Sequence, residues 1–311
     1  MQYNTKYLLL LNMKLKIIVI SFLLFYYNSY ECQEDSINTK RLYFVSGTLI
    51  SGTTSSLVLL NETWYKNYPR SNFHSFNDSQ EWLQMDKVGH AMTSYYIGYA
   101  VNETFRWTGL DRNKSMIYSS LTSLAYLSGL EILDGFSTQW GFSWSDMLAN
   151  SLGTALFTGQ ELLFNEQRMK LKFSAHKTPL AKYRPNVLGS NTSEQLLKDY
   201  NGQTYWLSIN IKDFLKEDAN FPSWINLALG YGADGMIGGH YNDPAFCNGD
   251  PNCLSLKRIR QYYLSFDVDL TKIKWERKFL STFFGTIGYI KLPFPTLEFS
   301  KNKTNYYWAY F

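Results

Sequence analysis

Polar and ionisable residues recur at helical spacing inside apolar, aromatic-rich segments between residues 81 and 153. Asp86 and His90 are four residues apart, and so are Asp146 and Asn150, so each pair shares one face of a helix. An unpaired polar group away from water is costly. The fold must therefore provide partners for these groups, and this requirement constrains the chain more than any other feature.

Four segments have the apolar pattern of helices: residues 42–60, 86–106, 114–131 and 145–163. The first has nineteen residues without a charge, enough to span a bilayer, although seven are Ser or Thr. The uncharged cores of the other three are short for a full span. Two interpretations remain, a small membrane bundle or a buried bundle attached to a membrane or a β-sheet. An aromatic content of 17% with only 18% charged residues favours the membrane bundle.

The pattern changes after residue 165. Residues 167–185 are basic and irregular, which predicts a linker, and a short helix is expected at 193–199. Alternation of period two predicts strands, and residues 279–290 are ambiguous between strand and helix. The predicted strands are residues 205–211, 225–231, 263–270 and 306–311.

The expected fold class is therefore α+β. A four-helix membrane-associated bundle occupies residues 34–165. A linker and a small antiparallel β domain occupy residues 166–311.

Residues 1–33 have the pattern of a secretory signal segment. Lys14 and Lys16 precede a short apolar core at residues 17–25, and cleavage is expected near Cys32. Ser29-Tyr-Glu-Cys32 is a poor lipoprotein signal, because it has too few small residues before the cysteine, so we expect export, with lipidation at Cys32 as the less favoured alternative. An exported chain meets an oxidising compartment, where Cys247 and Cys253 would form either a disulfide or two free thiols.

The polar residues of the helices are expected to meet at one level. In an antiparallel bundle with a short connection, the end of the third helix lies near the start of the fourth. An up-down order brings the start of the second helix to the same level. This predicted rim contains Asp86, Lys87, His90, Glu131, Asp134, Asp146 and Asn150.

The chemistry of the rim allows two interpretations. As a site, carboxylates and a histidine suit general acid–base catalysis or binding of a divalent metal cofactor. Lys87 would attract phosphate or neutralise the carboxylates, and with Asp134 it would bind substrate. Alternatively, the rim is a buried network that fixes the helix register, with Asp146 capping its helix. In the first interpretation the catalytic groups are Asp86, His90, Glu131, Asp146 and Asn150.

The spacing of the rim residues resembles that of the VanZ-like membrane proteins. The shared elements are Asp86-Lys-x-x-His90, then Glu131, and then Asp146-x3-Asn150-x2-Gly. This chain differs in having Asp134 where those proteins usually have Gln. The resemblance implies a link to glycopeptide tolerance and names no reaction.

A longer resemblance covers most of the mature chain. It is carried by residues 76–90, 132–137, 198–208, 230–236 and 291–298. In these runs the chain is similar to the YfiM-like family of uncharacterised bacterial envelope proteins, which are predicted periplasmic lipoproteins. The resemblance implies an exported, membrane-associated protein and supplies no activity.

These features predict a cell-envelope membrane protein that faces the periplasm, with the outer membrane favoured because weakly apolar helices escape retention in the inner one. We expect it to bind or process a lipid or a lipid-linked headgroup at the rim. The alternative is a non-enzymatic structural or assembly factor with envelope protein partners. A nucleic-acid partner is not expected, because no basic block with interleaved aromatic residues is present.

Overall fold

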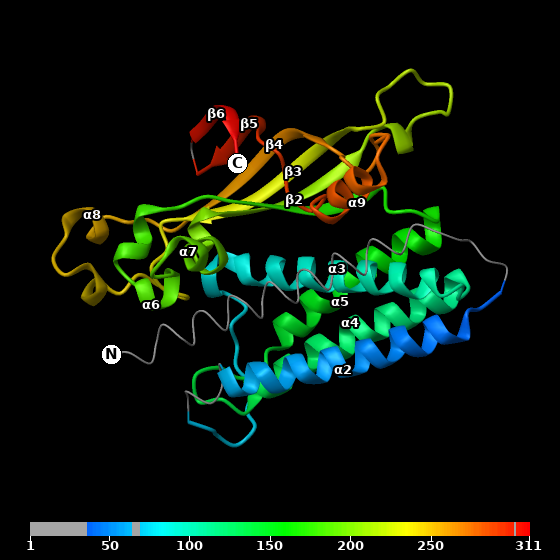
Figure 1. The fold of residues 1–311 in the computed structure, drawn as a ribbon. Helices are drawn as coiled ribbons and strands as arrows, with labels where there is room; N and C mark the ends of the chain where they lie inside the picture. Colours follow the sequence, from blue (N-terminus) through cyan, green and yellow to red (C-terminus); the bar gives the residue numbers. More distant parts are fainter. Residues whose placement is uncertain (1–35, 64–68, 302) are drawn as a thin grey trace.

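Helices form one layer of the molecule and a single antiparallel sheet covers it (Figure 1). The structure is a computed structural model that describes residues 36–63, 69–301 and 303–311. The predicted signal segment at residues 1–33, with Cys32, lies outside the described residues. The α+β fold class is confirmed.

All four predicted helices are present. Asp111 and Ser143 cap two of them, accepting hydrogen bonds from the amides of Lys114 and Asp146 at 3.0 Å each. α3 lies between the sheet and the other helices, and α2 is the farthest from the sheet (Figure 1). The four long helices are α2 (Thr39–Thr63), α3 (Met85–Trp107), α4 (Arg112–Gly135) and α5 (Trp144–Phe164).

Among the described helices, α2 alone is long and apolar enough to cross a membrane, by length and composition. The shorter α-helices lie in the connections between strands of the sheet. They are α6 (Pro185–Leu188), α7 (Thr192–Lys198), α8 (Pro251–Leu254) and α9 (Lys278–Thr286). Helix α7 was predicted, and α9 resolves the ambiguity at residues 279–290 in favour of a helix.

The sheet has six strands in sequence order, each antiparallel to its neighbour. Long connections that contain the short helices join β1 to β2, β3 to β4 and β4 to β5, whereas β5 and β6 form a tight hairpin. The strands are β1 (Met169–Ala175), β2 (Gln203–Asn210), β3 (Ile225–Asp234), β4 (Ile259–Val268), β5 (Phe294–Ser300) and β6 (Lys303–Tyr310).

Strand β1 corrects the prediction of a linker at residues 167–185. Lys170 and Lys172 are the reason that the strand was not predicted, because lysines between apolar residues are typical of a solvated surface segment. In the structure Lys172 Nζ lies 2.6 Å from Asp267 Oδ2, and this ion pair is buried. Lys170 Nζ likewise lies 2.9 Å from Asp269 Oδ2. Because the ion-pair partners of these lysines are distant in sequence, the local sequence pattern did not predict β1.

Strand β5 was also not predicted, because Pro293 and Pro295 argue against a strand. The register between β5 and β6 shifts between Phe294 and Thr296. Pro295, which has no amide hydrogen to donate, therefore lies at an irregularity where the sheet does not need one. The carbonyl of Pro295 still accepts a hydrogen bond from the Ser265 hydroxyl at 3.1 Å. A bulge therefore lets the strand contain a proline.

The structure forms the Cys247–Cys253 disulfide, with the two Cα atoms 5.3 Å apart. Both cysteines are buried, in an apolar cluster with Leu180, Leu188 and Ile237. Of the two alternatives that the sequence left open, the structure has the disulfide and not the free thiols.

Gly153 continues the helical stripe of Asp146 and Asn150, from which the sequence predicts the close approach of another helix, and it allows α3 and α5 to approach closely. A Cβ atom at Gly153 would lie 1.9 Å from the carbonyl oxygen of Ala91 on α3. That distance is far below van der Waals contact, so any larger residue forces the two helices apart. Gly159, on the same helix, has no atom within 4 Å of the equivalent position.

Substitution of these two glycines should therefore have opposite effects. Gly153→Ala should lower the free energy of unfolding by ~1–3 kcal/mol or more, because overpacking displaces backbone. Gly159→Ala should be neutral or stabilise by up to ~1 kcal/mol through helix propensity. Denaturant unfolding of the two variants checks this, and equal effects would contradict the close α3–α5 packing.

Candidate functional site

The ammonium group of Lys87 lies at the centre of the rim. Its Nζ atom is 2.6 Å from Asp78 Oδ2, 3.0 Å from Asp86 Oδ2 and 2.6 Å from Asp146 Oδ1. The Lys87 side chain is only 11% exposed. Phosphate binding by Lys87 stays a prediction, and it would require a phosphate oxygen to replace one of these carboxylates.

His90 lies one helical turn after Asp86 and faces α4 and α5. Its Nδ1 atom is 3.2 Å from Asn150 Oδ1 and 3.8 Å from Glu131 Oε1. Its Nε2 atom is 3.9 Å from Asp146 Oδ1. The structure therefore brings together the predicted residues of three helices at one level.

The loop between α4 and α5 shapes the rim. As the N-cap of α5, the Ser143 hydroxyl accepts a hydrogen bond from the Asp146 amide. The Ser143 amide donates to Glu131 Oε2 at 3.3 Å. The hydroxyls of Ser143 and Ser145 both donate to Asp78 Oδ1 at 2.6 Å. The N-cap of α5 is thus Ser143 and not Asp146, which corrects the predicted capping role of Asp146; the Asp146 amide is the donor to the cap.

Asp78 is a rim residue that the sequence interpretation missed. The segment that carries it runs beside the α4–α5 loop, where the Phe76 amide donates to the Phe142 carbonyl at 3.0 Å. The available signal was its place in the same acidic run as Asp86, within residues 76–90. It lacks helical periodicity with the other rim residues, so spacing alone did not include it.

Tyr200 was also missed, and it connects the rim to the sheet layer. Its hydroxyl donates to Asp86 Oδ1 at 2.6 Å. Tyr200 lies in a short turn, Tyr200–Gly202, directly before β2. Tyr200 and Asp86 are far apart in the sequence, so no local sequence pattern predicts this contact. Asp134 lies nearly one turn beyond Glu131 and acts on it through its charge.

Burial sets the protonation of the rim carboxyls. It raises the pKa of Glu131 to about 8, with the Asp146 charge acting in the same direction and His90 opposing it. Burial likewise raises the pKa of Asp146 to about 6, although His90 lowers it. Glu131 can therefore hold a proton near neutral pH, as a general acid does.

At Asp78, His90 and Lys87 the neighbouring groups together shift the pKa more than burial does. Burial would raise the pKa of Asp78, but hydrogen bonds from Lys87, Ser143 and Ser145 bring it well below its usual range. Burial would lower the pKa of His90, but Asp86, Asp146 and Glu131 together raise it. The carboxylates of Asp86 and Asp146 raise the pKa of Lys87 against the same effect of burial, so its ammonium stays charged.

Asp86, His90 and Asp146 could share a metal ion, because one ligand atom of each lies within 4.8 Å of the others. Carboxylate and imidazole groups suit a borderline divalent cation. However, the Lys87 ammonium already contacts both of these carboxylates. An ion would have to displace it, so a metal cofactor stays a prediction that this arrangement does not favour.

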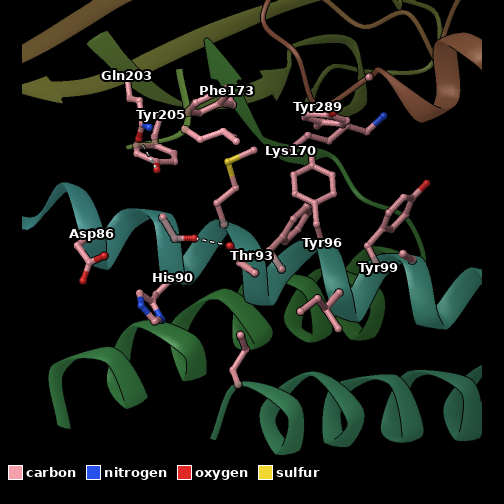
Figure 2. Close-up of a pocket in the computed structure, with 18 of the residues that line it drawn as sticks. Asp86, His90, Thr93, Tyr96, Tyr99, Lys170, Phe173, Gln203, Tyr205 and Tyr289 are labelled. Atoms are coloured by element: carbon pink, nitrogen blue, oxygen red, sulfur yellow. Dashed lines mark hydrogen bonds between the residues drawn. The ribbon is translucent and has the colours of Figure 1, made fainter. Parts of the chain in front are cut away.

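A cavity of about 840 Å³ lies between α3 and the sheet layer, and Asp86 and His90 belong to its lining. Figure 2 shows these two residues toward one end of α3, with Tyr96 and Tyr99 farther along the helix. Aromatic rings and apolar chains form most of the remaining wall. They include Tyr95, Leu127, Leu130, Phe173, Tyr205 and Tyr289.

Residues 74–160 match a family described as "Predicted periplasmic lipoprotein (DUF2279)". The matched segment contains α3, α4 and every rim residue described above except Tyr200. No curated protein and no solved structure matches the chain. The similarity supports an exported, envelope-associated protein of an uncharacterised family. The VanZ-like and YfiM-like resemblances and the choice of the outer membrane stay predictions.

The raised pKa of Glu131 predicts how stability depends on pH. Between its ordinary value of 4.5 and about 8, the folded protein keeps a proton that the unfolded chain releases. The free energy of unfolding should therefore decrease as pH rises through this window. Glu131→Gln should make the decrease smaller in denaturant titrations from pH 5 to 8. Glu217→Gln, in an exposed loop, is the control, and an unchanged slope for Glu131→Gln would contradict the prediction.

Proposed function

We propose that the protein binds a lipid or lipid-linked molecule, with the apolar chain in the cavity between α3 and the sheet and the headgroup at the rim. The observation that carries this proposal is the continuity of the two environments. Asp86 and His90 line the same cavity as Tyr96 and Tyr289, so one ligand can contact polar and apolar groups together. An amphiphile has this division of chemistry.

The size and lining of the cavity support a hydrocarbon chain. A volume of about 840 Å³ lies in the range of pockets that hold small molecules. Tyrosines present an apolar ring and a polar tip, so they tolerate a chain that begins at a headgroup. The Tyr205 hydroxyl already donates to Gln203 at 3.0 Å, which leaves its ring as the part that meets the cavity.

The charge of the rim favours a headgroup that carries amine or hydroxyl donors. Asp78, Asp86 and Asp146 supply three carboxylates, and Lys87 supplies one permanent cation. Carboxylates are acceptors only, so a headgroup with N–H or O–H groups pairs with them. If the headgroup is processed, His90, Asp146 and a protonated Glu131 would move protons at it, with Asp86 and Asn150 orienting these groups.

A structural or assembly role is the second candidate, and the buried ion pairs of Lys87 favour it. Such a network can serve only to fix the helices. A purely structural network satisfies its buried donors, however. Within the described part of the chain, Asn150 Nδ2 is buried and has no hydrogen-bond partner. The structural role alone does not account for this unsatisfied donor.

Filling the cavity tests lipid binding. Ala100 lines the cavity on α3, so Ala100→Trp should reduce the lipid that copurifies with the full-length protein at least several-fold. Ser151→Trp, at an exposed position of α5, should leave it unchanged. Mass spectrometry of lipid extracted from equal amounts of each protein measures the effect. Equal lipid in both variants, or none in the wild type, would overturn the proposal.

Abundance and function together separate the two candidates. If the rim is a binding or catalytic site, His90→Ala and Asp146→Asn should abolish function at normal protein abundance. Immunoblots would be read alongside envelope sensitivity to glycopeptides and detergents in the native host. Loss of the protein itself would instead support the structural role. Ser151→Ala, on the exposed side of α5, controls for nonspecific effects.

A further inference from the structure

In a sheet of a soluble protein the apolar face is normally buried, whereas in this sheet the polar face is the buried one. Strands with one wet face normally put polar residues outward. Here hydroxyl, amide and charged side chains from five strands are each at most 2% exposed. Representative members are Lys172, Thr204, Ser208, Asn226, Asp267 and Glu298.

The sheet buries these groups by curling around them. The Thr204 hydroxyl on β2 lies 3.2 Å from the Tyr310 hydroxyl on β6. In a flat sheet these strands would be roughly 19 Å apart, since neighbouring strands are separated by about 4.8 Å. Lys172 on β1 reaches Asp267 on β4 in the same way, and Asp267 also accepts from the Ser208 hydroxyl at 2.7 Å. The polar face is therefore concave and internally paired.

The opposite face of β3–β6, called the outer face below, is apolar and exposed. In the strand register Leu229, Leu264, Leu297 and Tyr306 form one row across the four strands. Nearby, Tyr262 is paired with Phe299. Leu229, Tyr262, Phe266, Leu297, Phe299 and Tyr306 are all between 37% and 59% exposed.

In the described part of the chain, the helical layer covers the apolar side of the sheet at its first three strands, β1–β3. Tyr231 on β3 donates its hydroxyl to the Leu83 carbonyl before α3, and Tyr205 on β2 lies against Gly89. Because the sheet curls, its later strands turn away from α3. In Figure 1, β5 and β6 lie on the side of the sheet that is remote from α2 and α4.

We propose that the outer face of β3–β6 contacts the hydrocarbon of a lipid bilayer. Burying polar groups while exposing aromatic rings is unfavourable in water on both counts. In a bilayer the same arrangement is favourable, and an apolar exterior around a polar interior is the pattern of membrane sheets. β3 and β4 have ten residues each, a length of roughly 33 Å, which matches a hydrocarbon core of about 30 Å.

A bilayer fits better than a second copy of the chain, because exposed apolar surface occurs on opposite sides of the molecule. α2 carries exposed Tyr43, Ile50 and Val58, and it is the described helix suited to a membrane. Figure 1 places it on the far side of the helical layer from the sheet. A single partner would cover one of these surfaces, whereas lipid surrounds both. The outer face is separate from the cavity, so this inference does not depend on ligand binding there.

Nitroxide labels at three outer-face positions test the proposal. The full-length chain carries Cys32→Ser and one of Leu229→Cys, Phe266→Cys or Leu297→Cys, while the Cys247–Cys253 disulfide does not react with the label. Each protein is placed in phosphatidylcholine vesicles, and relaxation by oxygen and by a water-soluble nickel complex is compared. Asp218→Cys, in the exposed loop before β3, is the control.

All three outer-face labels should be relaxed several-fold more by oxygen than by nickel, because oxygen concentrates in hydrocarbon. The label at residue 218 should show the reverse. Relaxation by nickel at the outer face would overturn the proposal. So would spin–spin broadening that disappears on dilution with unlabelled protein, since it would show that a second copy covers the face. Three independent positions keep the test decisive if one variant fails to fold.

Discussion

The ammonium group of Lys87 joins three parts of the chain that would otherwise repel one another. Asp78 comes from the segment before α3, Asp86 from α3 itself and Asp146 from the start of α5. Removing the Lys87 ammonium would leave these carboxylates without their shared cation, which is strongly destabilising. The order of helices at this end of the bundle, the cap of α5 and the position of His90 therefore all depend on this one cation and its carboxylates.

α3 serves two environments at once. One side carries Lys87 and His90 into the polar rim, and the other faces the cavity beneath the sheet. Two glycines make this arrangement possible, because Gly153 admits the α3 backbone and Gly89 admits the Tyr205 ring from β2. The cavity lies between the sheet and α3, and its polar end, at Asp86 and His90, is where the rim begins.

The sheet shows what the alternation of apolar and polar residues predicts and what it does not predict. Period two identified β2, β3 and β4, but it does not say which face is buried. Curling decided that question, because it lets Lys172 reach Asp267 and Tyr310 reach Thr204 across strands that are not neighbours. A lysine that pairs inside a curl has the same local sequence pattern as a lysine on a solvated surface, so β1 could not be recognised.

By itself the sequence determined the four long helices, the convergence of Asp86, His90, Glu131, Asp146 and Asn150, and the close approach at Gly153, because these follow from helical spacing and short connections. Only the tertiary structure decided the inclusion of Asp78 and Tyr200 in the rim, the choice of three carboxylates as the partners of Lys87 and the inward polarity of the sheet. Those features depend on contacts between residues far apart in the chain, and local periodicity carries no information about such pairs.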